Sequence, residues 1–325
     1  MYFFILVLAL LLIFIVYKYY KYREYESYIQ DYTPQKISDT FVNLNYENIL
    51  KGKAILKTKK IVICGLMRDC APNISFIQEY INKLSVVCAD YKVLIVENDS
   101  TDDTRKLLLE WSKQNDKVII LGCGINKDEC KLNLYKTQGH EANNERIKKM
   151  ADLRNIYIDY ISKNLSTYDY MFVMDMDLYG SWYLDGLMSS IALLEVDNNL
   201  DALAAFGLSI KSDNYYDPFA LRFKDMKNNF ETIEEKYEWD DKIFSIKSKE
   251  WLSKYKNLLP VKSAFGGLCI YKIASVISKN SKYDYPKDGK ISCEHVYFNE
   301  GLNMSINMDM IFIMLSNPTY FGYLL

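Results

Sequence analysis

The sequence lacks any surplus of positive charge. Its 40 Lys and Arg residues stand against 42 Asp and Glu residues, which gives a net charge of -2. Proteins that bind nucleic acid through its phosphate backbone need a basic surface, so nucleic acid is excluded as an expected partner. Internal repeats and low-complexity tracts are also lacking. Half of the 325 residues are hydrophobic, which is enough for one large globular core.

Histidine is scarce as well, with only two residues in the chain, and the seven cysteines do not form a zinc motif. Cys293 stands close to His295, but one cysteine beside one histidine lacks the spacing of zinc ligands. Cys64 and Cys269 lie within apolar runs, where reduced and packed thiols are expected. These thiols favour a reducing compartment over the secretory lumen.

Residues 1–23 are predicted to form a membrane anchor. Residues 2–17 carry no charge and, at about 1.5 Å per helical residue, extend roughly 24 Å, somewhat less than a bilayer core. A basic start and a small-residue cleavage site are missing, so an uncleaved transmembrane helix is favoured over a cleaved signal peptide. The flanking basic residues all follow the apolar run. This predicts a catalytic domain in the cytosol, with the ER or Golgi lumen as the alternative.

The rest of the chain is predicted to consist of a polar stem, residues 24–58, and one α/β domain, residues 59–325. From residue 60 onward, short apolar runs alternate with amphipathic stretches, which is the pattern of a parallel sheet covered by helices. Strands are expected at 60–65, 92–97, 117–121, 170–174 and 202–210, and helices at 73–88, 102–114 and 144–164. Residues 211–260 are acidic and show no regular pattern.

Two aspartates, Asp175 and Asp177, follow the all-apolar run 170–174. Alternate residues at a strand end place their side chains on the same side, and two carboxylates suit a hard divalent cation, Mn²⁺ or Mg²⁺. Such a cation would bridge them to a diphosphate and neutralise its charge as it leaves. Because two aspartates at this spacing also arise by chance, their position after a buried strand is what favours a metal site.

A second acidic segment, from Glu97 to Thr104, follows the strand 92–97. Part of it is explained as the start of a helix, in which hydroxyl groups cap the first turn and acidic groups complement the dipole. The residues concerned are Ser100, Thr101, Asp102 and Asp103. Capping does not account for Glu97 and Asp99, whose carboxylates can accept hydrogen bonds from a nucleobase or a ribose.

These segments together resemble GT-A glycosyltransferases, in order and spacing, over most of residues 59–300. The resemblance rests on the segment from Gly65 to Asp69 after the first strand, on Glu97 to Thr104, and on Asp175 to Asp177. The Glu-Asn-Asp-Ser-Thr-Asp string and the later Phe-Gly-Gly block are most similar to the fungal capsule-associated α-1,3-mannosyltransferase group and related viral or bacterial enzymes.

The resemblance implies a GT-A fold, with a Rossmann-like nucleotide-binding sheet, a metal-dependent diphosphate site and a more variable acceptor-binding half. It implies a hexosyltransferase that moves sugar from a UDP- or GDP-sugar donor to a hydroxyl group of a glycan, lipid or protein. Carried over to this chain, Asp99 lies at the nucleoside and Asp177 is the more direct metal ligand. Asp175 supports the ribose or the metal. Arg154, on the helix 144–164, and Arg68 point toward the donor diphosphate, which forked guanidinium bonds would suit. Ordinary solvated arginines are the alternative for both.

The block from Ser263 to Tyr271 contains two adjacent glycines. Gly266 and Gly267 let a backbone pass close to a ligand, and the resemblance implies that they border the acceptor and the donor sugar. A tight bend in a buried strand is the alternative. Later in the chain, Glu294 is a candidate general base for the acceptor hydroxyl, which would give inversion, and His295 is a candidate third metal ligand. A solvated surface pair is the alternative for these two.

Tyr216 and Asp217 are candidate acceptor contacts, because tyrosine rings stack on sugars and carboxylates accept their hydroxyl groups. With 28 tyrosines in the chain, chance explains much of this pattern.

Two other functions remain open at the level of sequence. A sugar nucleotidyltransferase shares a nucleotide-binding α/β half and paired carboxylates, although no glycine-rich phosphate loop follows the first strand, where only Gly65 occurs. A non-catalytic, membrane-anchored protein that keeps a transferase-like fold is the second, because a fold does not establish an activity.

Overall fold

A computed structural model describes residues 10–17, 45–122, 144–177, 179–209, 212–255 and 257–315 of the chain. The chain divides into two compact units, residues 1–44 and residues 45–325. Residues 10–17 of the expected anchor are helical, and the remainder of residues 1–23 lies outside the described residues. Among the helices that are described, none combines the length and the apolar character needed to cross a bilayer.

The first half of the second unit is the predicted parallel α/β sheet. Its strands carry apolar residues on both faces, as strands covered by helices on both sides require. The four strands are β1 (Lys60–Met67), β2 (Asp90–Glu97), β3 (Val118–Gly122) and β4 (Tyr170–Met174). They pair in parallel in the order β3-β2-β1-β4. The helices between them are α4 (Ile74–Ser85), α5 (Thr104–Gln114) and α6 (Asn144–Asn164). The prediction of a parallel α/β half is confirmed.

The sheet continues into a mixed second half. Beyond β4 the order is β10-β6-β11-β9-β8, in which β10 is antiparallel to both neighbours and β11 runs parallel to β6. The bounds are β6 (Ala202–Ser209), β8 (Arg222–Phe223), β9 (Leu258–Ser263), β10 (Leu268–Lys272) and β11 (Met304–Leu315). Two short strands, β5 (Tyr179–Trp182) and β7 (Asn214–Tyr215), pair with β11 and β6.

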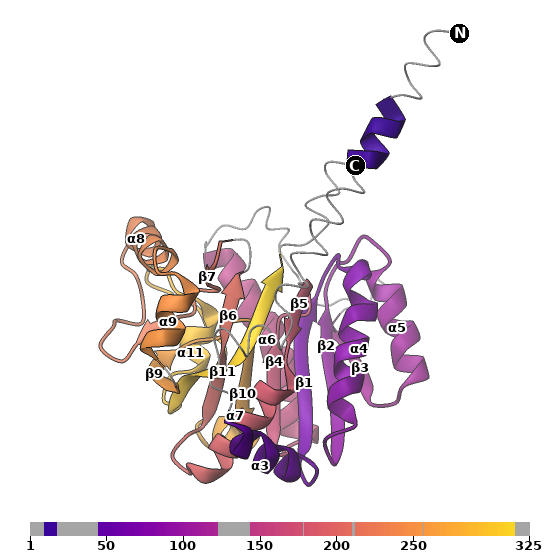
Figure 1. Ribbon diagram of the computed structural model, residues 1–325, viewed down its shortest axis with the longest axis horizontal. Helices are drawn as coiled ribbons and strands as arrows, with labels where there is room; N and C mark the ends of the chain where they lie inside the picture. The colour runs from indigo at the N-terminus through magenta and orange to yellow at the C-terminus, as the bar shows by residue number, and fades with distance from the viewer. Residues whose placement is uncertain are drawn as a thin grey trace. The chain divides into compact units, whose positions relative to one another are not determined.

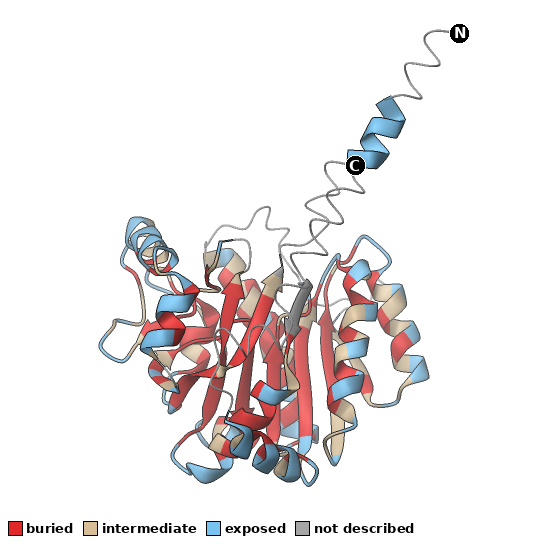
Figure 2. Cartoon of the chain, in the orientation of Figure 1, coloured by how far each residue is buried: buried red, intermediate tan, exposed pale blue. Residues whose placement is uncertain are grey.

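Helices at the two ends of the sheet frame the domain. Figure 1 shows α4 and α5 beside β1–β3 at one end, and α8 and α9 near β9 at the other. The remaining elements are η1 (Ala71–Asn73), α3 (Tyr46–Leu56), α7 (Leu184–Val196), α8 (Ile233–Phe244), α9 (Ser248–Lys254), α10 (Ile273–Ser278) and α11 (Glu294–Phe298). In Figure 2 the strands are buried along most of their length, whereas the helices expose their outer faces, so the core lies along both faces of the sheet.

Three expectations need correction. The domain begins at Asn45 and not at residue 59, because α3, expected in the stem, packs against α7. Gly52 makes that packing close, since a Cβ there would lie 1.7 Å from the carbonyl oxygen of Met188. Residues 211–260 are not irregular, since they contain β7, β8, α8, α9 and the start of β9. Finally, α5 begins at Thr104, two residues later than predicted.

Candidate functional site

The predicted metal motif follows β4, where the chain leaves the sheet. Met176 is fully buried, the Asp175 side chain is 16% exposed and Asp177 is exposed. The backbone N–H of Asp175 donates to the carbonyl of Gly267 at 2.9 Å, which ties the motif to the turn before β10. The two carboxylates therefore leave the sheet at a fixed point of the backbone.

Both oxygens of Asp175 have partners within the protein. The hydroxyl of Tyr216 donates to Oδ2 at 3.0 Å, and Nη2 of Arg154 lies 3.9 Å from Oδ1. Burial, followed by the charge of Asp177, raises the pKa of Asp175 to about 7, although Arg154 and Tyr216 oppose this change. The poorly hydrated Asp175 carboxylate, with Asp177 beside it, therefore lies where Arg154 and Tyr216 do not fully offset the negative charge.

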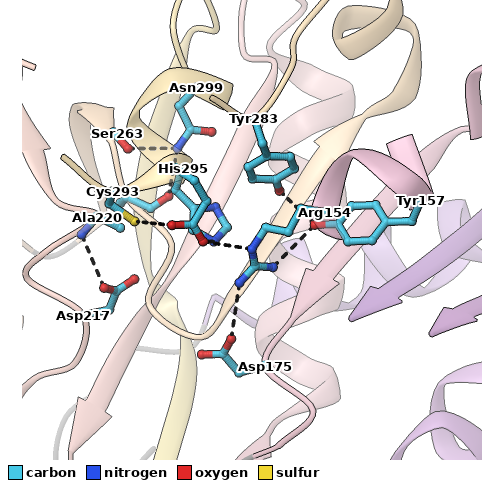
Figure 3. A network of polar contacts seen from close by, with 12 residues as sticks. Arg154, Tyr157, Asp175, Asp217, Ala220, Ser263, Tyr283, Cys293, His295 and Asn299 are labelled. Carbon is cyan, nitrogen blue, oxygen red and sulfur yellow. Dashed lines mark hydrogen bonds and ion pairs between the residues drawn. The ribbon is translucent and has the colours of Figure 1, made fainter. Parts of the chain in front are cut away.

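Arg154 joins this motif to a distant part of the chain. It is buried on α6, and its Nε donates to Oε1 of Glu294 at 3.0 Å across 140 residues of sequence. Figure 3 shows its guanidinium group directed toward Asp175 on one side and toward Tyr157 on another. Arg154 is therefore an interior residue, and its interpretation as a solvated helix arginine is wrong.

Glu294 and His295 begin α11 and are both buried. Oε2 of Glu294 accepts from the Cys293 thiol at 3.4 Å, so the interpretation of the two residues as a solvated surface pair is also wrong. The His295 ring stacks on Phe265 with centroids 4.1 Å apart, and neither ring nitrogen has a hydrogen-bond partner. Burial, then the charge of Arg154, lowers the pKa of His295 well below its ordinary value, so the imidazole is neutral.

The expected set of three metal ligands is not assembled. In the parts of the chain that the structure describes, no group of three or more His, Cys, Asp or Glu side chains is arranged to hold a metal ion. His295 is packed between Phe265 and Tyr283, which accounts for its position without a metal. Asp175 and Asp177 still fit a divalent cation as a pair, because hard cations take carboxylate oxygens and complete their shell with water and substrate phosphates.

Tyr216 and Asp217 come from the segment after β7 and lie beside the metal motif. Burial, then the charge of Asp175, raises the pKa of Asp217 well above its ordinary range. The backbone of Asp217 has a positive φ of 69°, and its Oδ1 accepts from the N–H of Ala220 at 3.3 Å. Asp217 thus adds a further carboxyl group to a region already rich in them.

The two glycines form the turn between β9 and β10, which corresponds to the alternative of a tight bend. Both have positive φ, 61° for Gly266 and 84° for Gly267. A Cβ on Gly266 would lie 2.2 Å from the carbonyl oxygen of Ala205, and one on Gly267 would lie 2.4 Å from the Phe312 ring. Positive φ and close packing, against backbone at Gly266 and against a side chain at Gly267, account for both glycines, and through Gly267 the turn holds the backbone of Asp175.

Arg68 follows β1 and Asp99 follows β2 in the chain, and the charges of both act on a third charged residue. Lys149 of α6 is only 7% exposed, and its pKa is lowered by burial and then by the charge of Arg68, while Asp99 opposes the change. Arg68 is itself exposed and pairs with Asp69 at 3.3 Å. The carboxyl ends of two parallel strands thus carry two cations and a carboxylate, at the edge where ligands bind in open α/β sheets.

Glu97 is a structural residue, and its predicted contact with a nucleobase or ribose is wrong. Its side chain is fully buried at the end of β2. Arg105 donates to both of its oxygens, at 2.6 and 3.3 Å, and the backbone N–H of Ser100 donates to Oε1 at 2.9 Å. Three internal donors leave this carboxylate no access to a nucleotide.

The predicted hydroxyl cap of α5 is not formed, since Ser100 and Thr101 contact the loop after β1, whereas Asp102 does accept from the first N–H of the helix. The hydroxyl of Ser100 accepts from the backbone N–H of Asp69 at 3.2 Å, and Thr101 donates to the Asp69 carboxylate from both its N–H and its hydroxyl. Asp102 accepts from the N–H groups of Thr104 and Ala71. The hydroxyl and acidic residues after β2 thus hold the loop after β1.

Sequence patterns did not identify several residues of the site. Lys149 and Arg105 were indistinguishable from other surface cations on amphipathic helices. Tyr157, Tyr283 and Phe265 surround Arg154 from three separate segments, and no local pattern connects them.

The sequence matches a known family. The family described as Cryptococcal mannosyltransferase 1 matches residues 77–298, which is more than half of the chain. No curated protein matches it significantly.

Solved structures with a similar fold include the mannosyltransferase PcManGT from Pyrobaculum calidifontis in complex with GDP-Man and Mn²⁺. It has 11% identity and a TM-score of 0.45, and the similarity covers 86% of this chain and 66% of that one. TarS from S. aureus has 14% identity and a TM-score of 0.43, with 81% of this chain and 38% of that chain covered. The chain therefore spans less than two thirds of the length of either protein. By its match over residues 77–298, the chain belongs to the Cryptococcal mannosyltransferase 1 family, the glycosyltransferase group that its motifs resemble.

Proposed function

We propose that this protein is a metal-dependent glycosyltransferase that moves a hexose, in the first instance mannose, from a nucleotide-sugar donor to a hydroxyl group of a glycan, lipid or protein. The observation that carries the proposal is an excess of carboxylates around one buried arginine. Arg154 is shared by Asp175 and Glu294, and Asp177 raises the pKa of Asp175 further. Membership of a mannosyltransferase family supports sugar transfer as the reaction.

The donor is proposed to bind across the carboxyl ends of β1, β2 and β4. Asp175 and Asp177 would hold Mn²⁺ or Mg²⁺, which supplies positive charge to the departing nucleoside diphosphate. Arg68 and Lys149 lie at the same edge of the sheet and add two cations that suit phosphate groups. Asp99, at the end of β2, accepts hydrogen bonds from the nucleoside in this arrangement.

The acceptor is proposed to react beside Glu294. Its carboxylate would take the proton of the acceptor hydroxyl while the acceptor oxygen forms a bond to the anomeric carbon. The bond from that carbon to the diphosphate oxygen breaks in the same step, and the electron pair leaves with the nucleoside diphosphate. Asp217 is the proposed contact to acceptor hydroxyls, because its carboxyl group lies beside the metal motif and carboxyl oxygens accept hydrogen bonds from hydroxyl groups.

The test is turnover of defined donors by the full-length protein. GDP-mannose, other GDP-sugars and UDP-sugars are incubated with Mn²⁺ or with EDTA, and the released GDP or UDP is measured. We expect release from one donor class in Mn²⁺ and none in EDTA. Pyrophosphate release from a nucleoside triphosphate would instead indicate a nucleotidyltransferase. Nucleotide binding without turnover across a broad acceptor panel would indicate a non-catalytic protein.

We also propose that residues 1–23 anchor the protein in a membrane with the domain on the cytosolic side. The support is the uncharged run 2–17 and the basic residues that follow it. Protease treatment of intact and of permeabilised vesicles distinguishes the two orientations. Digestion of the domain in intact cytosol-side-out vesicles is expected, and protection there would place the domain in the lumen.

A further inference from the structure

The position of Arg154 differs from that of an arginine that grips a ligand. Its side chain is 5% exposed, and it lies between carboxylates from two elements. Nε donates to Oε1 of Glu294 on α11 at 3.0 Å, and Nη2 lies 3.9 Å from Oδ1 of Asp175 after β4. One guanidinium group therefore connects the proposed general base with a proposed metal ligand.

The packing around the guanidinium group leaves it little freedom. Phe265 and Tyr283 contact it with ring centroids 5.4 and 5.7 Å from its central carbon. Nη1 donates to the Tyr157 hydroxyl at 3.4 Å, and that hydroxyl donates to Tyr283 at 3.1 Å. Each of the three nitrogens thus faces a protein partner. To reach a diphosphate, Arg154 would have to leave a buried carboxylate without its partner, which is strongly unfavourable.

Asp175 is held from its other side as well. The Tyr216 hydroxyl donates to Oδ2 at 3.0 Å, and the Asp175 backbone is bonded to Gly267. With Arg154 at Oδ1, the orientation of the carboxylate is set from three segments. Arg68, which is exposed, is a cation better placed for phosphate groups.

We propose that Arg154 is a positioning residue that fixes Glu294 and Asp175 relative to each other, and that it does not contact the donor diphosphate. This inference rests on the proposed function, because it assigns a role within that same site. It reverses the expectation from sequence, which directed Arg154 to the diphosphate. Its consequence is that a change at Arg154 lowers the rate of the chemical step and changes nucleotide affinity little, because Asp175 keeps its hydrogen bonds to Tyr216 and to the Gly267 carbonyl.

The experiment compares Arg154→Lys with Arg146→Lys, the same change eight residues earlier on α6. For full-length protein with Mn²⁺, calorimetry gives the Kd of GDP, or of UDP if the wild type uses UDP-sugars, and donor turnover gives kcat and KM. Lysine keeps the charge but cannot reach two carboxylates in a forked geometry. For Arg154→Lys we expect kcat to fall about 100-fold, the scale of a misplaced catalytic group, with the nucleotide Kd and the donor KM within about threefold of wild type. Arg146→Lys is expected to match wild type in all three quantities.

A second variant covers the case in which Arg154→Lys does not fold. Tyr157→Phe removes one partner of Arg154 and keeps its charge and the ring packing. It should lower kcat by less than Arg154→Lys would, again at an unchanged nucleotide Kd. A nucleotide Kd raised tenfold or more in either variant, with kcat retained, would overturn the proposal. If wild-type protein neither binds GDP or UDP nor turns over any donor, the proposed function fails first, and this inference fails with it.

Discussion

Replacing Asp175 by asparagine should raise the free energy of unfolding of the metal-free protein, and the same change should abolish activity. Burial and the charge of Asp177 raise the pKa of Asp175 from 3.8 to about 7 in the folded protein. Between these two values the folded chain binds more protons than the unfolded chain, so stability falls as the pH rises through this window. Above pH 7 the full cost of the buried charge is present, and an uncharged side chain of the same shape avoids it.

The size of the effect follows from the pKa. A shift of about three pKa units corresponds to about 4 kcal/mol at roughly 1.4 kcal/mol per unit. The effects of Arg154 and Tyr216 on the charged carboxylate are already contained in this pKa, so the only further loss is the poorer fit of an amide than of a carboxyl group at this position, which subtracts about 1–2 kcal/mol. We therefore expect Asp175→Asn to raise the free energy of unfolding by about 2–3 kcal/mol at pH 8 without metal.

The assay is urea denaturation of full-length wild type and Asp175→Asn in EDTA, at pH 8 and at pH 5. The advantage of the variant should shrink at pH 5, where wild-type Asp175 is protonated. Mn²⁺ should reverse the order at pH 8, because it binds the wild type and not the variant. Asp152→Asn, on the exposed face of α6, is the control and should stay within about 0.5 kcal/mol of wild type. A variant less stable than wild type at pH 8 in EDTA would refute the reasoning.

Three further predictions test separate parts of the structure. Asp177→Asn should abolish the Mn²⁺-dependent rise in melting temperature and the donor turnover, with a melting temperature in EDTA that is not lowered, because this side chain is exposed and its charge disfavours that of Asp175; retained turnover would exclude it as a metal ligand. Glu97→Gln should cost about 3–5 kcal/mol of stability in urea denaturation, since it leaves the mostly buried Arg105 without its partner charge, whereas a loss below about 1 kcal/mol would contradict a structural role. Gly267→Ala should cost about 2 kcal/mol or more and also weaken Mn²⁺ binding by calorimetry, because the added methyl group meets Phe312 and moves the carbonyl that holds Asp175; normal stability would contradict the close packing.

The first half of the fold was predictable because its strands and helices carry strong local patterns. The strands β1, β2 and β4 are apolar on both faces, and α4 buries one residue in every three or four. The strand β11 carries no such pattern. Ser305 and Asn307 are buried within it, and the side chain of Asn307 donates to Ser190 on α7 at 2.8 Å. Polar residues satisfied by a distant helix resemble loop residues in the sequence, so this central strand was not predicted.

The acidic residues at strand ends were predictable because they directly follow strongly apolar strands. The residues that they pair with were not predictable. The pattern of an apolar strand followed by aspartates located Asp175 and Asp177. The hydrogen bond from Arg154 to Glu294 joins residues that are 140 positions apart, and no local sequence pattern at either residue indicates it. The GT-A resemblance placed Arg154 and Glu294 in the same site, but it directed Arg154 to the donor diphosphate and not to Glu294. Side-chain pairing at such distances depends on how α6 and α11 pack, which only the structure specifies.

Two Glu–Arg pairs of this protein show why residue type alone did not separate structural from functional carboxylates. Glu97 and Arg105 form a closed pair, in which one cation satisfies one carboxylate through two hydrogen bonds. Glu294 shares Arg154 with Asp175, so the carboxylates outnumber the cation, and Asp177 increases the excess. Both pairs are buried, and both glutamates were candidate site residues in the sequence analysis. The difference lies in the local charge: the first pair is neutral by itself, whereas the second group has an excess of carboxylates, which protonation of Asp175 or the proposed cation would reduce.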